Sequence, residues 1–137
     1  MCNHLSKKGF SCTQELSVNN VSSLRADVIG CTIRGTIFIA EIKSCVRDYT
    51  SDKKILNYLS YCDRFFLVIT SITWQKLKKK NVEIDPRIGV LVQLENGNLK
   101  SVKKSKSLPL SDKRRLILLA RLAWRSGEFS KRTLGRK

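Results

Sequence analysis

Two carboxylate residues and a lysine, in two neighbouring apolar stretches, form the part of this sequence best suited to chemistry. Asp27 lies in RADVIGCT, and Glu41 and Lys43 lie near the end of GTIFIAEIKS. Residues two apart in a β-strand point to the same face, so Glu41 and Lys43 are expected to project together. Carboxylates can hold a hard cation, and an ammonium beside them can neutralise charge on a phosphate.

The turn between the two stretches decides whether Asp27 joins the other two side chains. If the loop is Ile33-Arg34-Gly35, with its glycine in the left-handed conformation, Asp27 lies directly opposite Glu41 on one face of a hairpin. A two-residue Arg-Gly loop would put the two carboxylates on opposite faces instead. An acid pair therefore depends on the three-residue loop.

Two facing carboxylates repel each other, and a divalent cation such as Mg²⁺ or Mn²⁺ relieves the repulsion. The backbone carbonyl of Ile42 could supply a further oxygen ligand, with Lys43 placed to orient the attacking water and to neutralise a phosphate. This arrangement predicts phosphodiester hydrolysis. The competing interpretation is a solvated or salt-bridged strand end, because acid-x-Lys triplets arise readily in a basic chain and Asp52-Lys53-Lys54 is a second one.

The apolar pattern predicts a mixed sheet with helical connections. Strands are expected over residues 10–18, 21–32, 35–44, 64–70, 88–94 and 99–103, and helices over 51–62 and 111–127, with a short basic helix or loop over 73–81. Thr50 or Ser51 is expected to cap the first long helix, and Ser111 the last. The link from 35–44 through a helix to 64–70 is a β-α-β crossover, which predicts that those two strands are parallel.

The Asp-x(13)-Glu-x-Lys arrangement resembles the PD-(D/E)xK nuclease superfamily. More narrowly, RADVIG, EIKS, DYTSDKK and YLSYCDRFF, within residues 25–66, are similar to the bacterial MmcB-like DNA repair proteins. The resemblance implies an α/β fold with a restriction-endonuclease-like mixed sheet, an αβββαβ core flanked by helices. It also implies a metal-dependent nuclease fold associated with DNA repair, with Asp27 and Glu41 as metal ligands and Lys43 as the catalytic lysine.

The chain departs from the superfamily pattern near its start. Ala26 replaces the usual proline before the aspartate, and the opening helix is reduced to roughly NHLSKKGF, which contains no acid. Either the start is truncated, or Glu15 serves as a third metal-binding acid; otherwise Glu15 is a solvated residue. Asp48 and Asp52 also match the narrower family, although acids there can simply favour a helix N-terminus.

The charge balance indicates a polyanionic partner. Lys and Arg total 27 against 11 acidic residues, which gives a net charge of +16 and favours DNA over an acidic protein or a membrane surface. Arg114, Arg121 and Arg125 are expected to line one face of the last helix, opposite Leu116, Leu119, Ala120 and Ala123. The candidate DNA-binding residues are Lys53, Lys76, Lys78, Lys79, Lys80, Lys103, Lys104, Arg114, Arg121 and Arg125.

Length and composition set the outer bounds. The 137 residues are enough for a single nuclease-like domain at 1–127, followed by a basic tail at 128–137. The five cysteines show no C-x2-C pair, so a zinc site is not expected, and the absence of a long apolar run or signal segment predicts a cytoplasmic protein without a membrane partner.

Two functions fit these observations. The first is a metal-dependent DNA endonuclease-like protein acting in repair, a Mg²⁺-dependent deoxyribonuclease. The alternative is a catalytically weak DNA-binding accessory protein on a nuclease scaffold. Assembly as a homodimer and assembly with a repair-protein partner are both left open by the sequence. An RNA- or ribosome-binding protein would fit the charge but would leave the acid pair unexplained.

Overall fold

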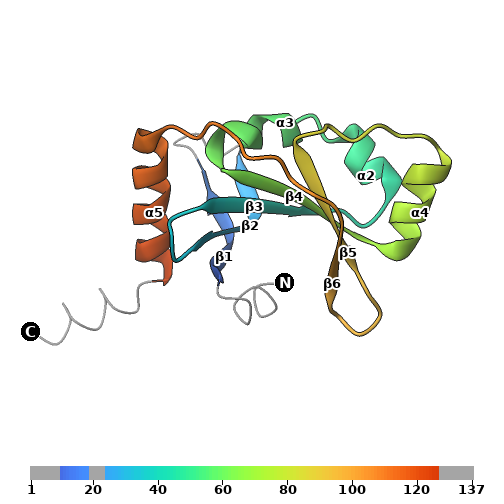
Figure 1. Cartoon of the computed structure of the whole chain (residues 1–137), viewed down its shortest axis with the longest axis horizontal. Helices are drawn as coiled ribbons and strands as arrows, with labels where there is room; N and C mark the ends of the chain where they lie inside the picture. The colour runs from blue at the N-terminus through green and yellow to red at the C-terminus, as the bar shows by residue number, and fades with distance from the viewer. Residues whose placement is uncertain (1–9, 19–23, 127–137) are drawn as a thin grey trace, which may run out of the picture.

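The described part of the chain folds into one six-stranded sheet with helices between and after its strands (Figure 1). The computed structural model describes residues 10–18 and 24–126; the segment NHLSKKGF and the tail 128–137 lie outside them except for Phe10. The strands are β1 (Phe10–Ser17), β2 (Arg25–Thr32), β3 (Ile37–Ile42), β4 (Arg64–Thr70), β5 (Ile88–Gln93) and β6 (Leu99–Lys103). The helices are α2 (Val46–Ser51), α3 (Ile55–Tyr58), the 3₁₀ turn η1 (Leu59–Tyr61), α4 (Ser71–Lys79) and α5 (Asp112–Ser126).

The strands pair in chain order, with a change of direction in the middle of the sheet. β1, β2 and β3 form an antiparallel meander, β3, β4 and β5 run parallel, and β6 returns antiparallel to β5. The predicted mixed sheet and the parallel pairing across the first crossover are therefore confirmed. The opening helix of the expected αβββαβ core lies outside the described residues, so that finer assignment stays a prediction.

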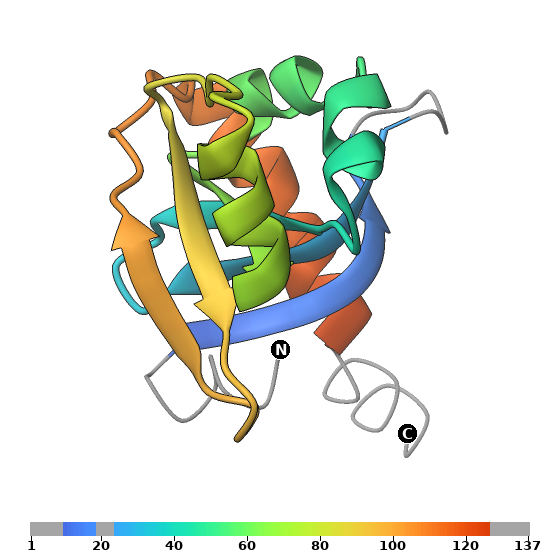
Figure 2. The ribbon, with the colours of Figure 1, turned by 90° about the vertical axis from the view of Figure 1, so that its right-hand side faces the viewer.

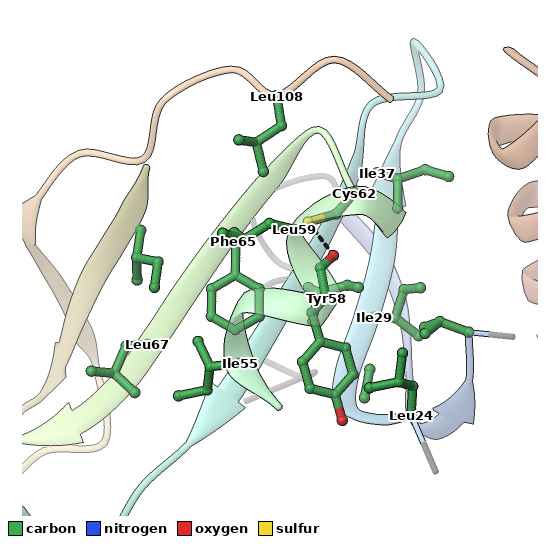
Figure 3. Packing of buried hydrophobic residues seen from close by; sticks show 14 of the residues in the cluster. Leu24, Ile29, Ile37, Ile55, Tyr58, Leu59, Cys62, Phe65, Leu67 and Leu108 are labelled. Carbon is green, nitrogen blue, oxygen red and sulfur yellow. Dashed lines mark hydrogen bonds between the residues drawn. The ribbon is translucent and has the colours of Figure 1, made fainter. Parts of the chain in front are cut away.

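Alternation along the strands separates a large core from a small one. Ile29, Ile39 and Leu67 point to the face covered by the helices, where they pack with residues of α3, α4 and α5. The opposite face carries a smaller cluster around Val28, Phe38, Ala40 and Val68, made of strand residues. Figure 3 shows the helix-covered core around Phe65, and Figure 2 shows the strong curvature of β1. Ile29 of β2 and Ile37 and Ile39 of β3 thus face the helices.

The helix predicted over 51–62 is wrong in its extent and its cap. Helix α2 ends at Ser51, and Asp52 follows it in an extended conformation. The backbone N–H of Asp52 donates to the Tyr49 carbonyl, while its carboxylate accepts the N–H of Lys54. Asp and Asn side chains commonly divert the chain in this way. Two short helices and a 3₁₀ turn therefore replace one helix.

The predicted apolar face of α5 is also wrong. Leu116 and Ala120 are exposed, whereas Leu118 and Leu122 are buried in the core and Leu119 packs against it. The side of α5 that faces the protein includes Arg115, which contacts Asp63 and the Gly35 carbonyl. A prediction based on apolar residues alone does not place an arginine on that side.

The Arg115 guanidinium fixes the rotation of α5. It pairs with both oxygens of the Asp63 carboxylate, at 2.7 Å from Nη2 to Oδ1, and also donates to the Gly35 carbonyl at 3.0 Å. Asp63 in turn accepts the Ile37 N–H at 2.7 Å. Burial by itself raises the pKa of Asp63, but Arg115 and the Ile37 amide outweigh it and lower that pKa. The turn between β2 and β3 is therefore tied to α5, as the position of α5 beside that hairpin shows (Figure 1).

The turn itself adopts the predicted three-residue form. The Gly35 N–H donates to the Thr32 carbonyl and the Thr32 N–H to the Thr36 carbonyl, each at 2.9 Å, and Gly35 has φ = 83°. The strand pairing places Val28 opposite Ala40, which is the register predicted for this loop. A side chain at Gly35 would meet only Leu119, at an ordinary 3.9 Å, so the requirement for glycine is conformational rather than steric.

We predict that Gly35→Ala lowers the free energy of unfolding by about 1–2 kcal/mol, the usual penalty for an L-residue in the left-handed region. Gly35→Asn should retain most of the stability, because Asn tolerates that region. Chemical denaturation of the three proteins measures the difference. Equal losses in the two variants would contradict a conformational origin.

Candidate active site

Asp27 and Glu41 lie at the open end of the β2–β3 hairpin, just beyond the last backbone-paired residues. Beyond the Val28–Ala40 pair, the Asp27 N–H donates to Glu41 Oε1 at 3.1 Å. The Ile42 N–H donates to Asp27 Oδ2 at 2.9 Å. Each carboxylate thus accepts a backbone amide of the facing strand, and the predicted convergence of Asp27 and Glu41 on one face of the hairpin is observed.

Glu41 is buried although it is acidic, with only 5% of its surface exposed. Desolvation, with a further contribution from the Asp27 carboxyl group, raises its pKa to about 8 against the lowering effects of the Asp27 amide and Lys43. Near neutral pH the pair therefore holds a proton between two oxygens. Two acids that cannot both ionise form a site that a cation would stabilise.

Lys43 lies next to this pair but is engaged by a different acid. Its ammonium forms an ion pair with Asp52, and about 15% of each side chain is exposed. Its backbone N–H donates to the Val68 carbonyl at 3.0 Å, which fixes the end of β3 against β4. Asp52 is held by Tyr49 and Lys54, as described above. The chain between α2 and α3 therefore sets the position of the lysine ammonium.

Tyr58 closes the site from the helical layer. Its ring is packed in the core, stacked at 6.1 Å on Phe65, and its hydroxyl donates to the Arg25 carbonyl at 2.8 Å. Figure 3 shows the hydroxyl at the edge of the cluster, directed away from Phe65. Burial raises the pKa of Tyr58, and the negative charges of Glu41, Asp27 and Asp52 raise it further. Tyr58 therefore stays neutral as a donor beside the acids.

Two further metal ligands were predicted, the Ile42 carbonyl and the Glu15 carboxylate. Because the N–H and C=O of a strand residue point to the same side, the Ile42 carbonyl is directed toward β2, as its N–H is. Glu15 belongs to β1, but its side chain lies outside the described residues. Within the described part of the chain, no group of three or more His, Cys, Asp or Glu side chains is placed to hold a metal ion. The acid pair would need water or substrate oxygens, which Mg²⁺ commonly retains.

The predicted DNA-binding residues are spread over several surfaces. Lys53, Lys79 and Lys104 are exposed, and Lys78 lies over the ring of Trp74 at 5.4 Å. Lys76 and Lys80 line a pocket beside α4. These positions leave a role in DNA binding as a prediction for each residue.

Several of the other cations make structural contacts. The Lys103 ammonium donates to the carbonyls of Asp85 and Ile88, and burial lowers its pKa. Arg121 and Arg125 donate to backbone carbonyls of β1. Arg114 donates to the Ser60 carbonyl and lies 4.5 Å above the Tyr61 ring. These contacts give the four side chains a part in the fold, and their role in DNA binding stays a prediction.

Sequence reasoning missed two residues of this site. The sequence suggests that Asp52 favours a helix N-terminus or matches the family pattern. Its ion pair with Lys43 cannot be predicted from spacing, because it depends on the extended conformation of Asp52 after the end of α2. Tyr58 gave no polar signal within an apolar stripe. The available signal is the tyrosine itself, because the hydroxyl of a buried tyrosine usually needs a hydrogen-bond partner.

The fold and the site together define a mixed α/β protein with an acid pair, one member of which is buried, and a lysine at the end of the same strand. The chain belongs to the MmcB-like DNA repair protein family, whose family model matches residues 2–121. The solved structure of the SPO1766 protein of unknown function from Silicibacter pomeroyi is similar, with a TM-score of 0.78 and 25% sequence identity. The similarity covers 95% of this chain and 83% of that chain. No curated protein matches the chain. None of the helices described here is long and apolar enough to cross a membrane.

The raised pKa of Glu41 predicts a pH-dependent loss of stability. Between its ordinary value of 4.5 and about 8, the folded protein keeps a proton that the unfolded chain releases, so the free energy of unfolding contributed by Glu41 falls as pH rises through this window. Glu41→Gln, which resembles the protonated acid, should remove this dependence. Denaturation from pH 5 to about pH 9 measures it.

The exposed substitution Glu83→Gln is the matched control and should leave the pH profile of the wild type unchanged. A wild-type profile parallel to that of Glu41→Gln would show that Glu41 ionises normally in the folded protein.

Proposed function

We propose that this protein is a divalent-metal-dependent DNA nuclease that acts in DNA repair, built on the scheme of the PD-(D/E)xK superfamily. The observation that carries the proposal is the reciprocal contact between Asp27 and Glu41, which holds a half-buried and a buried carboxyl group together at one strand end. The two carboxyl groups also satisfy backbone amides of the facing strands, and a divalent cation would stabilise both groups in their ionised form. Membership of a DNA repair family supports DNA as the substrate.

The donor set fits a hard divalent cation. Asp27 and Glu41 would hold it, with the Ile42 carbonyl directed to the same side, and all three offer oxygen. When bound, the metal supplies the acidification of a water molecule and the neutralisation of phosphate charge. The backbone contacts of the two carboxylates hold these groups beside each other before a metal binds.

Lys43 has the task of neutralising the scissile phosphate. Its ammonium already lies beside the acid pair, on Asp52, in a site where only about 15% of the side chain is exposed. A phosphate group offers more acceptor oxygens than Asp52 does, so the lysine can exchange one anion for the other while it stays charged. Tyr58, held neutral by its surroundings, remains a fixed donor at the rim.

An accessory DNA-binding protein is the second candidate function. Two observations favour it: the described residues contain no three-residue metal cluster, and Lys43 is committed to Asp52. In such a protein the acid pair would be a remnant of the scaffold, and the positive charge alone would carry DNA binding.

A cleavage assay separates the two functions. Supercoiled, single-stranded and branched DNA are incubated with the protein in Mg²⁺, in Mn²⁺ and in chelator. The nuclease is expected to cut in a metal-dependent way. Glu41→Gln and Lys43→Ala should each reduce the rate at least about 100-fold, as removal of one preorganised charge contact does in other hydrolytic sites.

The exposed substitutions Glu95→Gln and Lys100→Ala are matched controls and should retain the wild-type rate. Salt-sensitive DNA binding without cutting under any metal condition would establish the accessory function instead. Cutting that survives in Glu41→Gln would place the active site elsewhere.

A further inference from the structure

A surface pocket of about 380 Å³ lies directly after Lys43, and its lining combines apolar residues such as Val46 and Ile72 with polar and charged ones. We name it the cationic pocket; its charged lining residues are Arg47 of α2, Lys76 of α4 and Lys80, which follows α4. Ser44 and Thr73 also line it, and no acidic residue does. The pocket is separate from Asp27 and Glu41, and the family name gives it no role.

The three cations of the cationic pocket are not neutralised by the protein. No ion pair or side-chain hydrogen bond joins Arg47, Lys76 or Lys80 to a carboxylate within the described residues. The nearby Asp48 accepts the Ser44 hydroxyl at 2.6 Å instead. All three side chains are exposed and line the same pocket, so an anion bound there would face three cations that no carboxylate neutralises.

The floor of the pocket is rigid and joins it to the acid site. Thr70 caps α4 by accepting the Thr73 N–H at 3.2 Å, and the Thr73 hydroxyl donates to the Ser44 carbonyl at 3.3 Å. Ser44 is the residue after Lys43, so α4 is fastened to the strand that carries the candidate lysine. The pocket is therefore tied to the strand end that carries Glu41 and Lys43.

The pocket and the acid pair lie close enough for one nucleic-acid strand to reach both. Glu41 and Ser44 are three residues apart, so their Cα atoms are at most about 11 Å from each other. A strand of duplex DNA carries one phosphate per about 3.4 Å of helix axis, so phosphates a few nucleotides apart or less fall within this limit. One strand can thus place a phosphate at the acid pair and another in the pocket.

We propose that the cationic pocket binds a backbone phosphate of the DNA strand, a few nucleotides from the phosphate at the acid pair. This assignment rests on the proposed DNA function and adds a positioning site to it. Arg47 and the two lysines hold the phosphate oxygens, and the bound phosphate sets which bond of the strand lies over Asp27 and Glu41. Contacts of this kind position a strand without reading its sequence.

Affinity for a fluorescein-labelled DNA duplex, measured by anisotropy over a series of NaCl concentrations without added metal, tests the pocket. The pocket variant carries Arg47→Ala, Lys76→Ala and Lys80→Ala. Its matched control carries Arg34→Ala, Lys100→Ala and Lys113→Ala, which remove the same charge from exposed positions outside the pocket.

The pocket variant is expected to bind about 10-fold or more weakly, with a salt slope reduced by about 1, as the loss of a phosphate contact requires. The control should lose less than about 3-fold, through its general charge alone. Equal losses in the two variants would overturn the pocket and leave DNA binding in place. Circular dichroism confirms that both variants are folded before the comparison.

A titration with inorganic phosphate, followed by the amide resonances of Ser44 and Thr73, separates this inference from the proposed function. Shifts in the wild type that the pocket variant lacks support a phosphate site. If they occur in a protein that binds no DNA, the DNA function fails and the phosphate comes from another source. Absence of shifts, together with equal DNA affinities of the two variants, overturns the pocket.

Discussion

The structure of the site depends on a change in hydrogen-bond acceptors at one strand end. There, side-chain carboxylates instead of backbone carbonyls accept the backbone amides. Where the β2–β3 ladder stops, Asp27 and Glu41 each accept an amide of the facing strand. This satisfies both amides and holds two acids together in a place where one of them is almost fully buried. A pair of charges would be too costly there, so the pair retains a proton, and the same cost is what makes it a receptor for a cation.

The neighbouring elements are arranged around this constraint. The turn at Gly35 sets the register that brings the acids together, and Arg115 of α5 holds that turn through Asp63. On the other side, the extended residue Asp52 ends α2 and holds the Lys43 ammonium. The lysine therefore reaches the acid pair from a short, fixed strand end. The fastening of α4 to Ser44 then places three unneutralised cations next to the same strand end.

Sequence reasoning succeeded where the physical rule is local. Alternation and a single left-handed glycine determine the hairpin, and so the face shared by Asp27 and Glu41 could be predicted. It failed where a polar side chain decides the packing. The inward position of Arg115 depends on Asp63, which lies far away in sequence, and it turns Leu116 outward. The break at Asp52 and the pocket beside α4 likewise depend on contacts between segments, which periodicity does not contain.

The most direct measurement is a calorimetric titration of the protein with Mn²⁺ near pH 7, in two buffers that differ in ionisation enthalpy. A shared-proton acid pair that receives a metal ion predicts one binding site and release of about one proton, because Glu41 must ionise to bind. Glu41→Gln should abolish both the binding and the proton release. Absence of binding by the wild type, or binding without proton release that persists in Glu41→Gln, would contradict a metal site at Asp27 and Glu41.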